Sequence, residues 1–154
     1  MLKEKEIIES IEEVFEERPY QNDLEGFEIK TNKQIIKVLI SSGQQCCESF
    51  GYMISEDNPK EFIGAEINSI SVTTSGTHNK KIIAEFEELD FDKEAVWDDG
   101  TVFFDFEYGD AEFVDIDTNK GIFQIAVYNS HNGYYGHDIV IYFNGKEHSQ
   151  YGCL

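Results

Sequence analysis

Apolar residues recur every three or four positions at the start of the chain, which is the spacing of an amphipathic helix. Seven glutamates occupy most of the other positions in residues 2–17, and Arg18-Pro19 ends the pattern. The sequence therefore predicts an N-terminal helix within residues 1–19 that covers one face or edge of a sheet. The apolar side of this helix comprises Leu2, Ile7, Ile8, Ile11, Val14 and Phe15.

Farther along the chain, apolar and polar residues alternate with the period of a β-strand. Turns rich in Gly, Asn and Asp separate the short runs, which favours antiparallel hairpins. Residues 58–62 predict one helical turn, and the runs 122–127 and 139–143 are expected to form a hairpin whose tip is residues 128–137. The predicted strands are 25–31, 34–41, 65–73, 80–86, 101–107, 112–118, 122–128 and 139–143.

These elements predict an α+β fold class: an N-terminal amphipathic helix plus a largely antiparallel, strongly curved β-sheet or small open barrel. No Ser/Pro-rich linker or internal repeat divides the 154 residues. We therefore expect a single domain over residues 1–154, with the β-rich body in 25–143. With 40% hydrophobic residues, the chain has enough apolar side chains for a core.

The charge of the chain is strongly acidic, with 31 acidic and 12 basic residues and a formal net charge of −19. This charge disfavours direct binding to nucleic acid or to an anionic membrane, and it favours a basic partner. No apolar run approaches the roughly 20 residues of a membrane span. The first residues are too charged for a signal peptide, and the odd set Cys46, Cys47 and Cys153 is expected to be reduced. We expect a cytoplasmic protein.

An acidic belt, defined as residues 85–117, contains fourteen acidic residues and one basic residue, Lys93. Three interpretations stay open: a solvated sheet edge, a calcium site, and a surface that mimics the phosphate backbone of nucleic acid. The calcium pattern that starts at Asp90 lacks a glycine at its sixth position and a glutamate at its twelfth. The candidate binding residues in the belt are Asp90, Asp92, Asp98, Asp99, Asp105, Glu107 and Asp110.

Two further segments combine thiols, imidazoles and tyrosines. Cys46, Cys47, His131 and His137 are of the types that bind zinc or form a Cys-His nucleophile, but their spacing fits no zinc motif and no oxyanion loop is identifiable. Buried thiols and hydrogen-bonded turn histidines are the structural alternative. We expect no metal or cofactor. The candidate binding residues here are Cys46, Cys47, Glu48, Asn129, His131, Asn132, Tyr134, Tyr135 and His137.

Four short stretches carry a resemblance to a known family. They are Gly43-Gln44-Gln45-Cys46-Cys47-Glu48, Phe62-Ile63-Gly64-Ala65-Glu66-Ile67, Thr118-Asn119-Lys120-Gly121 and Asn132-Gly133-Tyr134-Tyr135. Their combination resembles a family of small domains of unknown function, common in phage and Gram-positive bacterial genomes, with QxCCE and NGYY motifs. The resemblance covers roughly residues 25–143. His131 and His137 stand where the family pattern has other residues, which argues against a histidine-dependent chemistry. The resemblance implies a mobile-element context and no established activity.

From the charge and the resemblance we expect a non-enzymatic, phage-encoded binding protein. Its expected partner is a basic, nucleic-acid-binding host defence factor, such as a CRISPR effector or restriction enzyme, which it would inhibit with a nucleic-acid-mimicking acidic surface. Two alternatives stay open. One is a small-ligand binding protein that sequesters a nucleotide signal, and the other is a metal- or thiol-dependent enzyme that uses Cys46, Cys47, His131 and His137.

Overall fold

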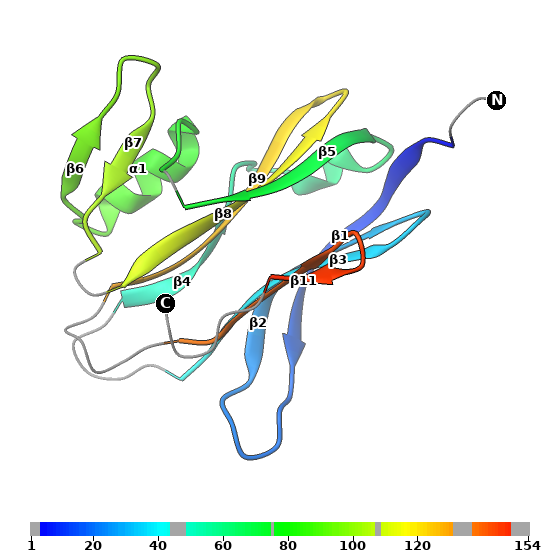
Figure 1. The fold of residues 1–154 in the computed structure, drawn as a ribbon, viewed down its shortest axis with the longest axis horizontal. Helices are drawn as coiled ribbons and strands as arrows, with labels where there is room; N and C mark the ends of the chain where they lie inside the picture. Colours follow the sequence, from blue (N-terminus) through cyan, green and yellow to red (C-terminus); the bar gives the residue numbers. More distant parts are fainter. Residues whose placement is uncertain (1–3, 44–48, 75, 107–108, 131–136, 149–154) are drawn as a thin grey trace.

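The computed structural model describes residues 4–43, 49–74, 76–106, 109–130 and 137–148 (Figure 1). The described chain is mostly β. Its single α-helix within these ranges is α1 (Lys80–Glu88), and a 3-10 turn, η1 (Pro59–Phe62), confirms the predicted helical turn. None of the helices in these ranges is long and apolar enough to cross a bilayer.

Nine strands form one antiparallel sheet in the order β11-β10-β3-β2-β1-β5-β8-β9-β4. A second, two-stranded sheet pairs β6 with β7. The bounds are β1 (Glu6–Glu16), β2 (Leu24–Thr31), β3 (Ile35–Ser41), β4 (Ser49–Ile54), β5 (Glu66–Thr73), β6 (Lys93–Val96), β7 (Val102–Phe104), β8 (Asp110–Thr118), β9 (Gly121–Ser130), β10 (Ile139–Phe143) and β11 (Lys146–Glu147).

The large sheet folds back on itself through β1, which pairs with β5 at its start and with β2 along the rest of its length. One layer then contains β2, β3 and β10, and the other contains β5, β8, β9 and β4 (Figure 1). The sheet does not close into a barrel, because β4 and β11 end the strand order without pairing to each other. The main core lies between the layers and includes Ile29, Val38, Val114, Ile125 and Ile141.

A third layer, which we call the acidic module, consists of α1 and the β6–β7 hairpin with their connections (residues 80–105). It packs on the outer face of β8, β9 and β4 (Figure 1). Phe86 of α1 is fully buried at the centre of this second core. β8 and β9 are consequently covered on both faces, and their middle residues are almost continuously buried. The second core comprises Met53, Ile82, Phe86, Val102, Phe104, Phe106, Ala111, Phe113, Ala126 and Tyr128.

The predicted N-terminal helix is wrong, because residues 6–16 form strand β1. A bulge between Ile8 and Ser10 shifts the alternation of the strand by one residue. Ile8 and Ile11, three positions apart, therefore both face the main core. The same three-residue spacing is what resembles a helix in the sequence. The fold is an open, mostly β structure in place of the expected combination of N-terminal helix and sheet.

Two other predictions about secondary structure are wrong. Residues 80–86 form α1 and not a strand: Asn79 caps the helix by accepting a hydrogen bond from the backbone N–H of Ile82, and Ile82 and Phe86 share one buried helix face. The expected hairpin of 122–127 and 139–143 does not form either. β9 pairs with β8 and β4, whereas β10 pairs with β3 and β11, so the two strands belong to opposite layers.

Candidate functional site

One segment contains Cys46 and Cys47, and the other contains His131, Tyr134 and Tyr135. The residues that flank both segments lie at the same end of the sheet. Ser49, where β4 begins, is paired with Ser130, where β9 ends. On the opposite layer, the backbone N–H of Ser41 at the end of β3 donates to the carbonyl of Asp138, just before β10. The structure thus brings the ends of both segments together. Seven of the candidate residues in them lie outside the described residues: Cys46, Cys47, Glu48, His131, Asn132, Tyr134 and Tyr135.

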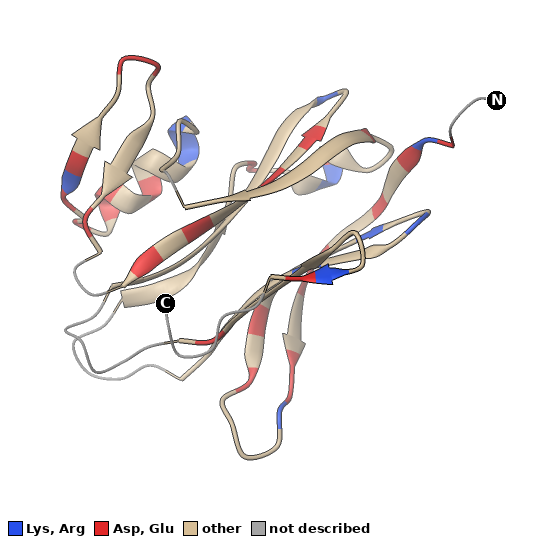
Figure 2. Cartoon of the chain, viewed as in Figure 1, with Lys and Arg blue, Asp and Glu red and all other residues tan. Residues whose placement is uncertain are grey.

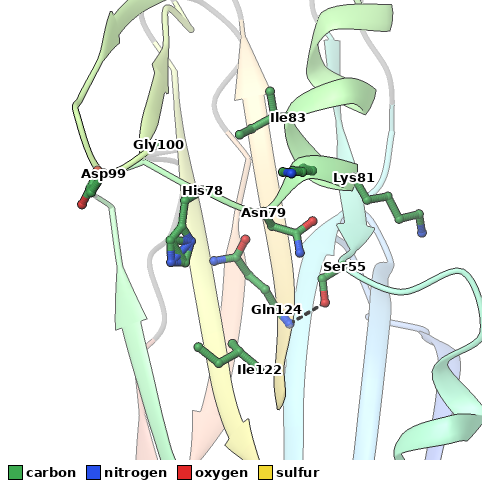
Figure 3. A pocket seen from close by; sticks show the side chains of 10 residues that line it. Ser55, His78, Asn79, Lys81, Ile83, Asp99, Gly100, Ile122 and Gln124 are labelled. Carbon is green, nitrogen blue, oxygen red and sulfur yellow. Dashed lines mark hydrogen bonds between the residues drawn. The ribbon is translucent and has the colours of Figure 1, made fainter. Parts of the chain in front are cut away.

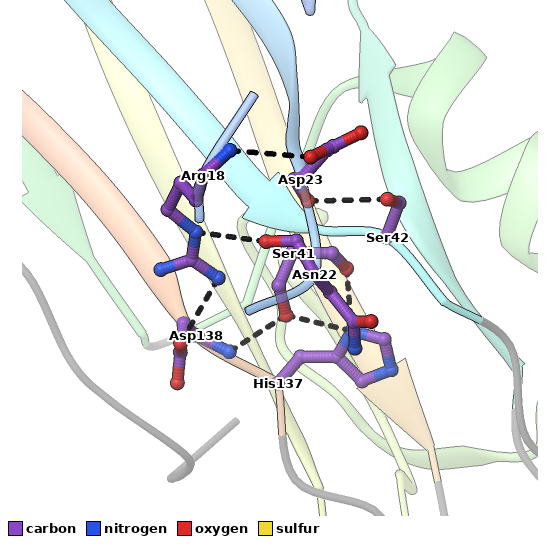
Figure 4. Close-up of polar contacts among 7 residues, drawn as sticks. All are labelled: Arg18, Asn22, Asp23, Ser41, Ser42, His137 and Asp138. Carbon is purple, nitrogen blue, oxygen red and sulfur yellow. Dashed lines mark hydrogen bonds and ion pairs between the residues drawn. The ribbon is translucent and has the colours of Figure 1, made fainter. Parts of the chain in front are cut away.

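His137 is buried at this end, with 3% of its surface exposed. Its ring stacks on Phe50 of β4 with centroids 4.1 Å apart. Its Nδ1 lies 2.6 Å from the carbonyl oxygen of Ser41 and 3.1 Å from the Ser41 hydroxyl (Figure 4). A carbonyl oxygen only accepts, so Nδ1 carries the proton and donates it. These contacts hold the imidazole between the two layers.

An ion pair fastens the β1–β2 turn to the same end (Figure 4). The Arg18 guanidinium lies 3.2 Å from the Asp138 carboxylate, and both side chains are largely buried, with 16% and 23% exposed. The Nε of Arg18 also donates to the carbonyl of Asn22. Asp23 accepts a hydrogen bond from the backbone N–H of Arg18. Arg18 therefore has a structural role that links the β1–β2 turn to β10.

Two buried polar side chains, Glu112 and Asn129, lie on neighbouring strands near this end, and the exposed Asp110 lies beside them. Asp110 is directly opposite Asn129 in the β8–β9 pair, and Glu112 is opposite the core residue Val127. Asn129 and Glu112 are buried, with 0% and 4% exposed. Burial raises the pKa of Glu112 above its ordinary value of 4.5, and the neighbouring carboxylate of Asp110 raises it further. Burial also raises the pKa of Asp110.

Asp110, a candidate residue of the acidic belt, begins β8, and five others are divided between the two ends of the β6–β7 hairpin. Asp90, Asp92 and Asp105 lie at its base, where the N–H of Asp105 donates to the carbonyl of Asp92. Asp98 and Asp99 lie at its tip, between the two strands. All five are exposed. Glu107 lies outside the described residues.

Metal ligation finds no support in the described part of the chain. Within it, no three His, Cys, Asp or Glu side chains are arranged to hold a metal ion. The five exposed aspartates of the module are spread along the hairpin, so the calcium pattern beginning at Asp90 does not form a ligand cluster there.

A hollow of about 660 Å³ lies beside the start of α1, between the helix and β9 (Figure 3). Lys80 and Lys81 line its helix side. The ammonium of Lys81 donates to the carbonyls of Ile54 and Glu56, and it also forms ion pairs with Asp57 and Glu85. The lining comprises Ser55, His78, Asn79, Lys80, Lys81, Ile83, Asp99, Gly100, Ile122 and Gln124.

A smaller hollow of about 260 Å³ shares His78, Asp99 and Gln124 with the first one and extends under the hairpin tip. Its floor is Gln124, which is 4% exposed. The side-chain oxygen of Gln124 accepts from the Thr77 hydroxyl at 2.6 Å, and its amide donates to the Asp115 carboxylate at 2.6 Å. The lining comprises Gly76, Thr77, His78, Trp97, Asp99, Thr101, Asp115 and Gln124.

Trp97 and Asp99 form the hairpin side of the smaller hollow. Trp97 is 56% exposed and packs against Phe103 with ring centroids 4.7 Å apart. The Asp99 carboxylate accepts a hydrogen bond from the backbone N–H of Thr101 at 2.9 Å. This hydrogen bond lowers the pKa of Asp99 below its ordinary value, with a smaller contribution from the nearby His78.

Sequence reasoning identified Asp99 in this region and missed the other residues that line the smaller hollow. His78 had no distinguishing motif, and Gln124 and Asp115 stand on adjacent strands as ordinary polar positions. Trp97 offered one usable signal, because it is the only tryptophan of the chain and lies within the acidic belt. An isolated tryptophan among carboxylates is typical of a surface that binds a partner.

The fold and these surfaces define an acidic domain built on an open antiparallel sheet with a projecting helix-and-hairpin module. The chain belongs to a family described as a domain of unknown function, DUF7448, whose match covers residues 4–141. The matched region includes β1, which the resemblance in the sequence left outside. No curated protein and no solved structure matches the chain.

Proposed function

We propose that this protein is a non-enzymatic binding protein whose acidic module engages a basic protein. The observation that carries the proposal is the exposure of carboxylates on this module. Eight of them are exposed, whereas Lys93 is the single basic residue between positions 82 and 119. The exposed carboxylates are Glu87, Glu88, Asp90, Asp92, Glu94, Asp98, Asp99 and Asp105.

The three lysines of the module, Lys80, Lys81 and Lys93, offset only part of this negative charge. Lys93 forms an ion pair with Glu87 at 2.9 Å, and Lys81 is held by Glu85 and Asp57. A surface with this excess of negative charge attracts a cationic partner and accelerates its association. The phosphate backbone of nucleic acid attracts the same partners by the same interaction. A nucleic-acid-binding protein is therefore the partner class that we propose.

The acidic residues of the chain do not gather on one face. Figure 2 shows red segments on α1 and the β6–β7 hairpin and a separate set on β1 and β2, with further red segments on β8. Several carboxylates of the second set have partners within the fold: Glu16 is bonded to Lys37 at 2.8 Å, and Glu13 accepts from the hydroxyl of Tyr52 at 2.7 Å. We therefore assign the binding surface to the acidic module alone.

The resemblance to domains of phage and Gram-positive bacterial genomes supports a narrower proposal. In that context the basic partner is a host defence factor that binds nucleic acid, such as a CRISPR effector or a restriction enzyme, and the protein inhibits it inside the host cytoplasm. The proposal predicts competition with DNA. Addition of the protein to a DNA cleavage assay of such an enzyme should slow cleavage, and excess DNA should reverse the effect.

Binding to an oligoarginine peptide at increasing salt concentrations tests the broader proposal. The affinity should fall steeply with salt, because the screening length shrinks from about 10 Å at 0.1 M to about 3 Å at 1 M. Binding that persists unchanged at high salt would contradict it. A triple variant of the module, Glu88→Gln, Asp92→Asn and Glu94→Gln, should weaken binding. A control variant with the same charge change on other exposed residues is Glu9→Gln, Glu12→Gln and Glu17→Gln, and it should weaken binding less.

A second candidate function is the binding of a small ligand at the end of the sheet near His137. The observation that favours it is the burial of three polar side chains, Glu112, Asn129 and His137, where both motif segments begin and end. Polar groups in an apolar surrounding supply the orientation that a small-molecule site needs. Native mass spectrometry of the freshly purified protein tests it: a bound small molecule that is lost in Asn129→Ala supports the site, and a bare wild-type mass contradicts it.

A further inference from the structure

We propose that the smaller hollow, between the hairpin tip and β9, is a pocket for one arginine side chain of the basic partner. We call it the arginine pocket and define it by Trp97, Asp99, Asp115 and Gln124. The inference rests on the proposed function and specifies where on the protein an arginine of the partner binds. Its basis is the convergence of an exposed aromatic ring, two carboxylates and a rigid polar floor around one cavity of about 260 Å³.

Trp97 supplies the ring for stacking. It keeps more than half of its surface in solvent, although tryptophan is usually largely buried. Contact with Phe103 and a backbone hydrogen bond from the N–H of Trp97 to the carbonyl of Thr101 fix its position. A planar guanidinium stacks well on an indole, and tryptophan is the best ring for a cation–π contact. The exposed ring is therefore ready to receive arginine without rearrangement.

The two carboxylates come from different elements and are both oriented by the fold. The Oδ1 of Asp99 accepts from the N–H of Thr101, and the Oδ1 of Asp115 accepts from the Gln124 amide. A carboxylate has about four lone-pair sites that can accept hydrogen bonds. The bond described for each aspartate uses one of them, so both carboxylates can still accept hydrogen bonds from a guanidinium. The hydrogen bond from Thr101 favours the ionised form of Asp99 and lowers its pKa. A guanidinium has five N–H donors in a fixed fork, which suits two carboxylates in one cavity.

Hydrogen bonds through Thr77 connect Gln124, the floor of the arginine pocket, to the β6–β7 hairpin that forms its wall. The hydroxyl of Thr77 donates to Gln124 on β9, and the backbone of Thr77 forms two hydrogen bonds with Val102 of β7, at 3.1 and 2.7 Å. Ser55 adds two further bonds to the backbone of Gln124, both at 2.9 Å. Asp115 is therefore placed by the same network that places the hairpin. Such preorganisation lowers the entropic cost of binding.

The charges around the two hollows indicate which one takes the cation. Lys80 and Lys81 line the larger hollow and would repel an arginine there. The smaller hollow has no lysine or arginine in its lining, and its charged groups are Asp99 and Asp115, with His78 at the shared border. Arginine fits better than lysine, because an ammonium neither stacks on a ring in this way nor bridges two carboxylates with a planar fork.

Fluorescence titration tests the pocket directly, since Trp97 is the only tryptophan of the chain. The probes are an oligoarginine peptide and an oligolysine peptide of the same length. We expect the oligoarginine to change the emission of Trp97 and to bind more tightly than the oligolysine. Asp99→Asn should weaken oligoarginine binding about tenfold, because it removes the exposed carboxylate that would form a charge-assisted hydrogen bond to the guanidinium stacked on Trp97. The asparagine keeps an oxygen that can accept from Thr101, so the turn should be retained.

Asp92→Asn is the matched control, because it removes the same charge from an exposed position of the module that does not line the hollow. It should change the affinity by no more than about twofold, as expected of an exposed charge that does not line the arginine pocket. Equal weakening by Asp99→Asn and Asp92→Asn would overturn the arginine pocket and leave the proposed function intact. Absence of oligoarginine binding to the wild-type protein would overturn the proposed function, and the pocket with it.

Discussion

The attachment of the acidic module to the sheet depends on Phe86, and Phe86→Ala tests this dependence. The side chain is fully buried. It contacts five aromatic rings, with centroid distances of 5.7 Å to Phe91, 5.1 Å to Phe104, 5.4 Å to Phe106, 6.5 Å to Phe113 and 5.2 Å to Tyr128. Its removal loses the transfer energy of a buried phenylalanine and leaves a cavity that rigid neighbours cannot fill. The expected loss in the free energy of unfolding is about 3–5 kcal/mol.

Urea denaturation followed by two probes measures this loss. Far-UV circular dichroism reports mainly on the large sheet, and the fluorescence of Trp97 reports on the hairpin of the acidic module. We expect the transition midpoint of Phe86→Ala to fall in both signals, and to fall more in fluorescence if the module separates before the sheet unfolds. In thermal unfolding, each kcal/mol corresponds to a shift of about 2–4 °C for a chain of this size.

Leu89→Ala is the control for this experiment. Leu89 follows Glu88 at the end of α1 and is 43% exposed, so its truncation should cost less than about 1 kcal/mol. A loss below about 1 kcal/mol in Phe86→Ala would refute the reasoning. Such a result would mean that the ring cluster does not hold α1 and the hairpin on β8 and β9.

Three further predictions concern other parts of the fold. Glu112→Gln should stabilise the protein at pH 7 and have no such effect below pH 4.5. The reason is that burial raises the pKa of Glu112, and such a carboxylate lowers the free energy of unfolding once the pH rises above its ordinary pKa of 4.5. Urea midpoints at both pH values would measure this, and an equal effect at both would contradict it. Gly26→Ala should destabilise by at least about 2 kcal/mol, because its methyl group would collide with the backbone oxygen of Val38; a stable variant in thermal unfolding would exclude this close approach. A double-mutant cycle of Arg18→Ala and Asp138→Ala should give a coupling energy of about 1–3 kcal/mol, since the ion pair is largely buried, whereas a coupling near zero would exclude this role.

Local alternation was sufficient to predict most strands of the two main layers. The predicted runs 25–31, 34–41, 112–118 and 139–143 agree with β2, β3, β8 and β10 to within about two residues at each end. In the run 101–107 the strand β7 covers only Val102–Phe104, but the alternation of the described residues agrees with the prediction: Val102, Phe104 and Phe106 are buried, and Asp105 is exposed. Each of these strands packs at least one face against a core, so near neighbours in the sequence carry its apolar pattern.

The two errors that exchanged helix and strand have different origins. Ile8 and Ile11 have helical spacing only because a bulge changes the phase of β1, and the bulge depends on pairing with β2, whose residues are distant in sequence. Residues 80–86 were assigned to a strand, although the cap at Asn79 and the four-residue spacing of Ile82 and Phe86 were already present in the sequence. In the first case tertiary pairing decided the conformation, and in the second a local signal was overlooked.

The sequence by itself determined the acidic charge, the β-rich composition, the turns and the faces of most strands, because these depend on residue type and on near neighbours. Only the tertiary structure decided that β9 and β10 lie in opposite layers and that Trp97, Asp99, Asp115 and Gln124 line one hollow. The partner of each strand lies far away in the sequence and is decided by the total burial and hydrogen bonding of the whole sheet. A local sequence pattern does not include these distant residues, so it cannot predict the pairing.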